Sequence, residues 1–413
     1  MKQKNESTRI LLLGGNHLMI SLVEECQAMG FTVYVTDNIK NSPAKTISDY
    51  FFDISIRDID AILEIIKEHK IQGVLCGFTD SVLPYYRAIC QKAHLPCYIS
   101  NDKQIEVTTN KEELKTVLKK FEIPYLKSYL ATEISTDKFP IIVKPADNSG
   151  GRGVQICHSA DTFLQALQLA EASSPSKKTI IEKKIDSKEA TAFYYMDQGK
   201  LTFLGLGDRI VKKKYGNNIP LPVLYRFPSD DENNYLFQLD NKVRALINHL
   251  EIKNGLIYLQ TFNHKDGFIV YELAHRLTGS LEYKIFECMF GINAAKKMAK
   301  YSVGQPTQEN TKAIDKKQAD YYNLTISCED KDDIFYVDGL EEISALPNII
   351  YLHKNFEVGE KNSPSRKGTL EEVIFRVLFS ATNDKDASKT INKIKKILKT
   401  KDKLGNNIPY FTY

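Results

Sequence analysis

The sequence lacks the features that mark several large classes of protein. None of its apolar runs approaches the roughly 20 residues that a membrane-spanning helix needs. The N-terminal segment MKQKNESTRILLLGG is not a signal peptide, because Gly14 and Gly15 interrupt its short apolar run where a strand would end. We therefore expect no membrane partner and a cytoplasmic location.

Cysteine pairs and an excess of one charge are also missing. The 7 cysteines are scattered without any C-x-x-C pair, which argues against a cysteine zinc site or a disulfide framework. The 56 basic and 52 acidic residues nearly balance, leaving a net charge of +4 that does not require a nucleic-acid partner. The Lys-rich stretch 391–403 is predicted to be the polar face of a surface helix.

What is present begins with alternating strand and helix patterns. The expected strands and helices of this first part are residues 10–13, 19–29, 31–36, 59–69 and 73–76. Alternation of this kind predicts a parallel sheet with helices on both faces, and we assign it to a Rossmann-like domain over residues 1–102. The segment that begins at Gly14 lacks the G-x-G-x-x-G spacing, so a substrate-lining loop or a plain turn is favoured over a dinucleotide site.

The pattern changes after about residue 102. The elements expected next are a helix over 110–121, a strand over 141–144, a strand–turn–strand over 177–189, strands over 256–262 and 268–272, and a helix over 292–303. We assign residues 103–305 to a central domain. The polar stretch 305–317 is the candidate boundary, and residues 306–413 form a small C-terminal α+β domain in this prediction.

The strongest chemical signal is a lysine at a strand end followed by a glycine-rich loop. Lys144 closes the strand in IIVKPADNSGGRGV, and the loop contains Ser149, Gly150, Gly151 and Gly153. Glycines let backbone N–H groups turn toward anionic oxygens, and the lysine adds a positive charge for phosphate. The lysine precedes the glycines, so this is not a P-loop. A bare glycine-rich hairpin is the alternative for this segment alone.

Together with its flanks, this segment resembles the ATP-grasp superfamily, in particular its carbamoyl-phosphate-synthase and glycinamide-ribonucleotide-synthetase branch. The resemblance covers nearly the whole chain and depends on the order and spacing of the motifs. It implies a Rossmann-like N-terminal domain, a central ATP-grasp domain of two α+β subdomains with a lid over about residues 123–185, and a small C-terminal domain. It also implies an ADP-forming ligase that activates a small carboxylate as an acyl phosphate and joins it to an amine or similar nucleophile.

The resemblance further implies which residues bind ATP. Lys111 and Lys144 match the two lysines that reach the phosphates, and Ser149–Gly153 matches the lid over them. A hinge strand and a ribose-binding acid would hold the adenosine. The residues at these positions are Glu182, whose side chain would accept from the adenine amino group, Lys183, Lys184 and Ile185, whose backbone would pair with the ring, and Glu189 at the ribose. Without the resemblance, these acids could be solvated strand residues.

Two strands are expected to present the metal ligands. Gln260 and Glu272 match the positions at which the family holds Mg²⁺, with Mn²⁺ as a substitute, and hard oxygen ligands of this kind suit the ion. Ala274 replaces the asparagine of the family's Glu-x-Asn-x-Arg pattern, which puts a second metal ion in doubt. Arg276 matches the family arginine. Arg276 and Lys144 are the predicted catalytic residues, which would neutralise the negative charge of the transferring phosphoryl group.

The acid and the nucleophile are not identified by any motif. Asn16, Thr79 and Asp80 lie on loops that face the reaction centre in the family, and they are candidates for the acceptor pocket. The expected partners are small-molecule carboxylate and amine substrates, and homodimers are common among relatives. Two alternatives remain: a nucleotide-binding protein that has lost catalysis, supported only by Ala274, and a biotin-carboxylase-like enzyme, disfavoured by the short and charged C-terminal part.

Overall fold

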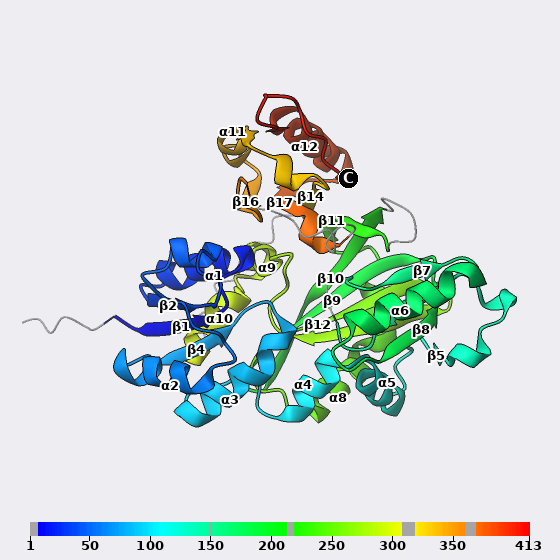
Figure 1. Cartoon of the computed structure of the whole chain (residues 1–413), viewed down its shortest axis with the longest axis horizontal. Helices are drawn as coiled ribbons and strands as arrows, with labels where there is room; N and C mark the ends of the chain where they lie inside the picture. The colour runs from blue at the N-terminus through cyan, green and yellow to red at the C-terminus, as the bar shows by residue number, and fades with distance from the viewer. Residues whose placement is uncertain (1–6, 149–150, 213–218, 308–318, 360–368) are drawn as a thin grey trace, which may run out of the picture.

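The computed structural model describes residues 7–148, 151–212, 219–307, 319–359 and 369–413. Its first part, blue in Figure 1, is a four-stranded parallel sheet with the order β3-β2-β1-β4. The strands are β1 (Arg9–Leu13), β2 (Thr32–Thr36), β3 (Tyr50–Phe52) and β4 (Gly73–Cys76), and the helices between and after them are α1 (His17–Ala28), α2 (Ile59–Glu68) and α3 (Leu83–Ala93). The apolar side chains of β1 and β4 are almost fully buried, as expected for central strands of a parallel sheet.

A second, antiparallel sheet lies at the other side of the molecule and carries the glycine-rich loop. Its strand order is β5-β8-β6-β7. The elements are β5 (Ser128–Tyr129), β6 (Ile141–Pro145), β7 (Gln155–Cys157) and β8 (Thr179–Lys183), with α6 (Phe163–Ser173) packed on β6. Two helices lead into it, α4 (Asp102–Thr109) and α5 (Lys111–Lys120). We call this the lid sheet.

The third sheet has eight strands in the order β13-β12-β9-β10-β11-β14-β17-β16, and all neighbours are antiparallel. Its strands are β9 (Lys188–Asp197), β10 (Lys200–Lys212), β11 (Leu221–Phe227), β12 (Gly255–His264), β13 (Gly267–His275), β14 (Asp320–Ser327), β16 (Ile349–Lys354) and β17 (Val373–Ala381). Three C-terminal strands therefore extend the central sheet, which the sequence did not predict. The proposed division into domains stays a prediction, and most of the candidate boundary at 305–317 lies outside the described residues.

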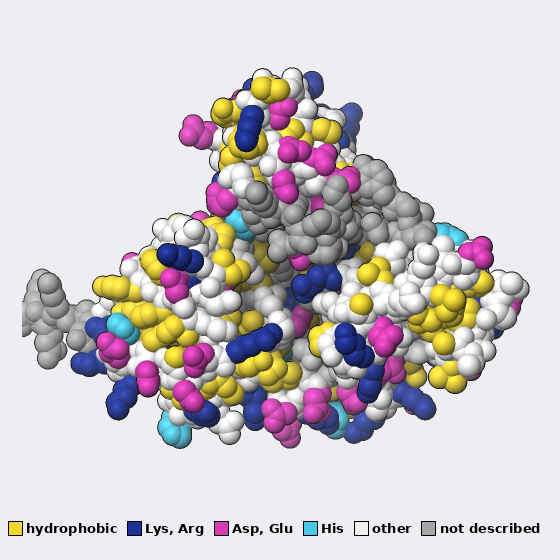
Figure 2. All heavy atoms as spheres, in the orientation of Figure 1, with side chains coloured by type: hydrophobic (Ala, Val, Ile, Leu, Met, Phe, Trp, Pro, Cys, Tyr) yellow, Lys and Arg dark blue, Asp and Glu magenta, His cyan; other side chains and the backbone are white. Residues whose placement is uncertain are grey.

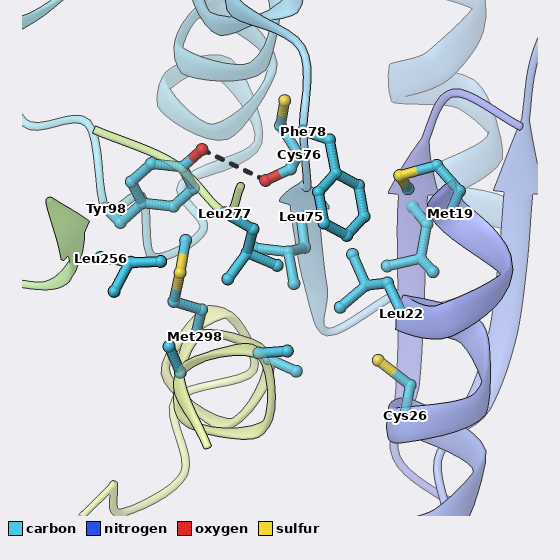
Figure 3. Close-up of a cluster of buried hydrophobic side chains, with 14 of the residues drawn as sticks. Met19, Leu22, Cys26, Leu75, Cys76, Phe78, Tyr98, Leu256, Leu277 and Met298 are labelled. Atoms are coloured by element: carbon cyan, nitrogen blue, oxygen red, sulfur yellow. Dashed lines mark hydrogen bonds between the residues drawn. The ribbon is translucent and has the colours of Figure 1, made fainter. Parts of the chain in front are cut away.

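Helices cover both faces of the large sheet. One face packs with the N-terminal sheet through α9 (Tyr283–Phe290) and α10 (Ala294–Ser302), and the other face packs on α8 (Asn241–His249) and α12 (Asp384–Ile397). Figure 3 shows the joint on the first face, where Met298 of α10 lies near Leu75 of β4 and Leu256 of β12. The Tyr98 hydroxyl donates to the Cys76 carbonyl there at 3.2 Å. This core fixes the N-terminal sheet against the edge formed by β12 and β13.

The predicted α/β fold class is confirmed by these sheets. The predicted surface helix over 391–403 is wrong at its end, because α12 stops at Ile397 and β18 (Lys399–Lys401) pairs with β15 (Tyr336–Asp338). Buried Thr400 explains the change, since its hydroxyl donates to the Ile408 carbonyl at 2.7 Å. The remaining short helices are α7 (Glu232–Tyr235) and α11 (Leu340–Ser344).

Across the described ranges, no helix has the length and apolar character needed to cross a bilayer. All 7 cysteines are free, and five of them are buried.

Candidate functional site

A buried carboxylate held between two lysines marks the inner face of the lid sheet. Glu182 of β8 lies 2.6 Å from the ammonium of Lys144 on β6 and 2.6 Å from that of Lys115 on α5. Its side chain is only 2% exposed. Burial alone would raise the pKa of Glu182, but the two lysines hold it below its ordinary value. The structure thus brings together two residues that the sequence singled out, Lys144 and Glu182.

Lys115 was missed by sequence reasoning. It stands one helical turn after Lys111 on α5, and residues four apart share one helix face. That spacing is the signal that could have found it, because a helix presenting Lys111 toward the glycine-rich loop presents Lys115 to the same side.

Lys111 lies at the start of α5 and contacts the loop that follows β6. Its ammonium donates to the Asn148 carbonyl at 2.9 Å, and its backbone N–H points to the Ala146 carbonyl at 3.4 Å. Asn110 caps α5 through its side-chain oxygen, which fixes the start of the helix at Lys111. The first turn of α5 is therefore tied directly to the glycine-rich loop.

The pKa of Lys111 reports which charges surround it. Burial lowers this pKa, and the like charge of Lys144 lowers it further, whereas Glu272, Asp80 and Glu182 raise it. These groups come from four different elements: β6, β8, β13 and the loop after β4. The predicted phosphate, adenine and metal residues therefore converge on one place. Figure 2 shows a hollow in the middle of this view, between the N-terminal part and the lid sheet, with Lys and Arg side chains at its margin.

Gln260 and Glu272 lie directly opposite one another on β12 and β13. Both side chains are partly exposed, and the strand register shifts just after Gln260, which re-aims the local side chains. Among the described residues, no group of three or more His, Cys, Asp and Glu side chains could hold a metal ion. An amide and a carboxylate oxygen still fit Mg²⁺, because this ion keeps several water ligands and needs few from protein.

Ala274, the next residue after Glu272 on the same face of β13, has no side-chain oxygen. Ala274 is buried and pairs across the strands with Tyr258, whose ring is 3% exposed. The neighbouring His275 is fully buried, and its Nε2–H donates to the Asn254 carbonyl at 2.8 Å. Burial lowers the pKa of His275 to about 4. His275 therefore cannot replace the missing asparagine as a metal ligand.

Arg276 is held by a carboxylate of the N-terminal part. Its guanidinium forms two hydrogen bonds with Asp80, of 2.5 and 2.7 Å, and stacks over the Tyr258 ring at 5.6 Å. Burial alone would lower the pKa of Arg276, but Asp80 raises it well above its ordinary value. The Leu277 N–H also donates to the Gly77 carbonyl at 3.1 Å. The loop after β4 is therefore docked on the end of β13, and Asp80 contacts Arg276 rather than open solvent.

The predicted adenosine residues lie along β8 and the start of β9. Glu189 forms an ion pair with Arg209 and accepts from the Tyr271 hydroxyl at 3.1 Å. Lys183 has an exposed side chain, whereas Lys184 pairs with Asp186. The Lys184 N–H donates to the Pro140 carbonyl at 3.1 Å, so this backbone group is already used. Ile185 follows in the link to β9.

The lid residues are described only in part. Ser149 and Gly150 lie outside the described residues. Gly151 and Gly153 have φ angles of +78° and +73°, and a Cβ on Gly153 would approach the Ser173 Cβ to 2.5 Å. Both positions therefore require glycine, as the sequence prediction of a glycine-dependent loop implies.

Two of the acceptor-loop candidates have local roles. The Asn16 side chain is exposed and accepts from the Met19 N–H at 3.3 Å, which caps α1. Thr79 precedes the short 3₁₀ turn Asp80–Val82. Of the three candidates, Asp80 is the one in contact with a predicted catalytic residue.

Residues 110–310 match the family of the ATP-binding domain of the carbamoyl-phosphate synthase L chain. The chain is 24% identical over 213 residues to the formate-dependent phosphoribosylglycinamide formyltransferase of Wolinella succinogenes, covering 48% of this chain and 53% of that protein. It is 28% identical over 195 residues to the enzyme of the same name from Prochlorococcus marinus strain MIT 9312, covering 43% and 48%. The chain thus spans about half the length of the curated relatives it matches.

Solved structures resemble the whole chain. The L-amino acid ligase from Bacillus licheniformis has a TM-score of 0.76 at 16% identity, over 95% of this chain and 98% of that one. The phosphoribosylglycinamide synthetase from Anaerococcus prevotii has a TM-score of 0.71 at 15% identity, over 96% and 100%. The biotin carboxylase domain of the Hydrogenobacter thermophilus 2-oxoglutarate carboxylase, solved with MgADP, has a TM-score of 0.76 at 14% identity, over 98% and 91%. At these identities the likeness shows a shared fold.

Proposed function

We propose, from the premise that residues 110–310 form an ATP-grasp domain of the carbamoyl-phosphate-synthase branch, that this chain is an ADP-forming ligase. It would activate a small carboxylate as an acyl phosphate and join it to an amine or a similar nucleophile. The observation that carries the proposal is the convergence of Lys111, Lys144 and Glu182 with Glu272, because it gathers cations and hard oxygen ligands in one place. A triphosphate with its metal ion has the complementary charges.

The lysine–carboxylate cluster suggests how ATP would be received. We propose that phosphate oxygens replace Glu182 on Lys144, while Lys111 binds the same phosphates from the other side. The carboxylate of Glu182 would then be available for the adenine amino group. Backbone groups of Lys183, Lys184 and Ile185 would meet the ring once Lys184 leaves the Pro140 carbonyl, and Glu189 would meet the ribose. Ser149, Gly150, Gly151 and Gly153 would close over the phosphates.

Gln260 and Glu272 would hold Mg²⁺, or Mn²⁺ in its place, because the two residues are opposite each other on neighbouring strands and both carry side-chain oxygens. When bound, such an ion neutralises phosphate charge and orients the terminal phosphoryl group. With Ala274 buried against Tyr258, these two residues favour one ion over two.

The chain's own contribution to the reaction would be positioning and charge. Asp80 fixes the Arg276 guanidinium at the end of β13 and leaves part of its N–H fork for a ligand. Lys144 and Arg276 would stabilise the negative charge that spreads over the phosphoryl group as the substrate carboxylate attacks it. Closure of the glycine-rich loop would keep water from the acyl phosphate before the nucleophile arrives. The homodimer expected from the resemblance and the cytoplasmic location expected from the sequence remain part of this proposal.

A nucleotide-binding protein without turnover is the second candidate, and Ala274 in place of an asparagine favours it. Two measurements discriminate the candidates: binding of the ATP analogue AMP-PNP with Mg²⁺, and ADP release with a panel of small carboxylates and amines. The ligase proposal expects tight AMP-PNP binding and ADP release that needs both a carboxylate and a nucleophile. Binding without ADP release for any pair would favour the second candidate, and ADP release with bicarbonate alone would favour a carboxylase.

A further inference from the structure

Two lysines flank the Glu182 carboxylate, and they differ in how many other groups hold them. Lys144 lies 2.6 Å from one carboxylate oxygen, and among the described residues no other acceptor contacts its ammonium group. Lys115 lies 2.6 Å from the other oxygen, donates to the Ser128 hydroxyl at 2.5 Å and lies 3.5 Å from Glu112. An ammonium group has three N–H donors, so Lys115 has one acceptor for each donor and Lys144 has an acceptor for only one.

The three acceptors of Lys115 are themselves fixed against one another. Ser128 of β5 stands directly opposite Glu182 of β8 in the strand register. Glu112 lies in the first turn of α5 and accepts from the Ser128 hydroxyl at 3.1 Å. The apolar face of the same helix is buried. Lys115 therefore joins α5, β5 and β8, and it cannot leave Glu182 without leaving its other two acceptors as well.

Lys144 has more freedom to move. It lies near the end of β6, just before the glycine-rich loop. Glu182 stands opposite Ile142 in the strand register, two residues before Lys144, so both charged side chains lie on the same face of the lid sheet. Lys144 can therefore turn from Glu182 to a phosphate oxygen with the loss of one ion pair, whereas Lys115 would lose three contacts. Lys144 is the exchangeable cation of this cluster, and Lys115 is the fixed one.

Glu182 needs a cation both before and after this exchange. Its side chain is 2% exposed, and a carboxylate at such a position is strongly destabilised when its partner leaves. If Lys144 were the only partner, its transfer to phosphate would leave a buried charge uncompensated, and nucleotide binding would be weakened by that cost. With Lys115 in place, Glu182 keeps one cation throughout.

We propose that Lys115 is a positioning residue of the nucleotide site, which keeps Glu182 charged and in place while Lys144 transfers to the phosphates. Lys115 acts through Glu182 and touches neither the phosphates nor the metal ion. It is needed because the same carboxylate has two successive tasks, holding Lys144 before ATP binds and receiving the adenine amino group afterwards. This inference rests on the proposed ligase function, because it concerns how the proposed site receives its nucleotide.

A purely structural role for Lys115 makes a different prediction. If Lys115 only anchors α5 to the lid sheet, its removal should weaken nucleotide binding to the same extent whether residue 182 is charged or neutral. If Lys115 compensates Glu182, its removal should matter only while residue 182 carries a charge. Glu182→Gln removes that charge and retains a side-chain oxygen that can accept from the adenine amino group.

The test is a double-variant cycle read out by titration of the full chain with AMP-PNP and Mg²⁺. Lys115→Met should raise the Kd of AMP-PNP about tenfold or more, because Glu182 then retains Lys144. In the Glu182→Gln background the same change should alter the Kd by less than about twofold. Lys115→Gln, which keeps an amide donor for Ser128 without the charge, should behave like Lys115→Met in both backgrounds and separates loss of charge from loss of packing.

Lys119→Met is the matched control, since Lys119 is exposed one turn further along α5, and its Kd should equal that of the unaltered protein. An unchanged Kd in Lys115→Met and Lys115→Gln would overturn the inference. Equal increases with Glu182 and with glutamine at that position would also overturn it, because the effect would then not depend on the charge. Failure of the unaltered protein to bind AMP-PNP would overturn the proposed ligase function and this inference together, which distinguishes the two failures.

Discussion

The two charged regions of the molecule differ in how their charges are compensated. Around the lid sheet and β13, three cations meet a protein carboxylate: Lys144 and Lys115 meet Glu182, and Arg276 meets Asp80. Around β17, Arg376 meets none of the described carboxylates. The first region is stable without a ligand because its carboxylates occupy the places proposed for phosphate. The second keeps an unbalanced charge, which is costly at a buried position.

The largest expected effect is on the rate of ADP release and comes from removing the Lys144 ammonium group from the first region. Lys144→Ala should lower the rate of ADP release by about 10²–10³-fold, the usual cost of losing one group that stabilises transition-state charge. Glu182 retains Lys115, so the midpoint of thermal unfolding should change little. Lys178→Ala is the control, because Lys178 is exposed just before β8. Turnover that survives the Lys144 change would contradict the placement of the phosphates.

The Arg276–Asp80 pair gives the second effect, this time on stability. Arg276→Leu leaves Asp80 without its cation at a partly buried position, and we expect a loss of about 3 kcal/mol in the free energy of unfolding. The double change Asp80→Leu and Arg276→Leu should recover part of that loss, because no unpaired charge remains. Urea unfolding of the three proteins measures this. A double variant as unstable as Arg276→Leu would show that packing, rather than charge, dominates here.

A third effect concerns acid sensitivity, since each region buries a neutral histidine. His275 has a pKa of about 4 in the folded chain and about 6.5 when unfolded. Its contribution is therefore complete above about pH 6.5 and is lost as the pH falls toward 4, by at most about 1.4 kcal/mol per pH unit. Stability measured against pH should fall less steeply over this range in His275→Gln, which can still donate to the Asn254 carbonyl.

The control for this measurement is His158→Gln, because His158 is exposed and should leave the pH dependence unchanged. His353, with a pKa of about 3, should add a similar acid-dependent loss from the second region. An acid profile that is the same in His275→Gln and the unaltered protein would show that His275 is charged or solvent-accessible in the folded state.

The smallest expected effect gives the most direct comparison between the two regions. Arg376→Leu makes the same chemical change as Arg276→Leu but leaves no described carboxylate without its partner. We expect the free energy of unfolding to stay within about 1 kcal/mol of the unaltered protein, or to rise, because a buried unpaired charge is removed. Urea unfolding beside Arg276→Leu checks this. A loss as large as that of Arg276→Leu would mean that Arg376 has a structural partner.

Much of this site followed from local patterns in the sequence. Lys144 and Glu182 lie on neighbouring strands of the lid sheet, and Gln260 stands opposite Glu272, as strand periodicity and motif order allow one to expect. Such pairs depend on the register between neighbouring strands. The family resemblance supplied their roles.

What the sequence did not reveal depends on long-range packing. Asp80 and Arg276 are 196 residues apart, and their contact requires the docking of β4 on the end of β13. Arg376 carries no motif, because its lack of a described carboxylate partner follows only from how the sheets pack. The extension of the central sheet by β14 and β17 was missed for the same reason, since strand order across a polar boundary has no local signal.

The hydrogen bonds between β11 and β14 make the central and C-terminal strands one mechanical unit. Glu189, which is proposed to meet the ribose, and the distant Arg376 lie on the same continuous sheet. A shortened protein ending near residue 306 would turn β11 into a bare edge with unsatisfied backbone groups, inviting association with other chains. The part that is proposed to bind nucleotide is therefore inseparable in practice from the strands that complete its sheet.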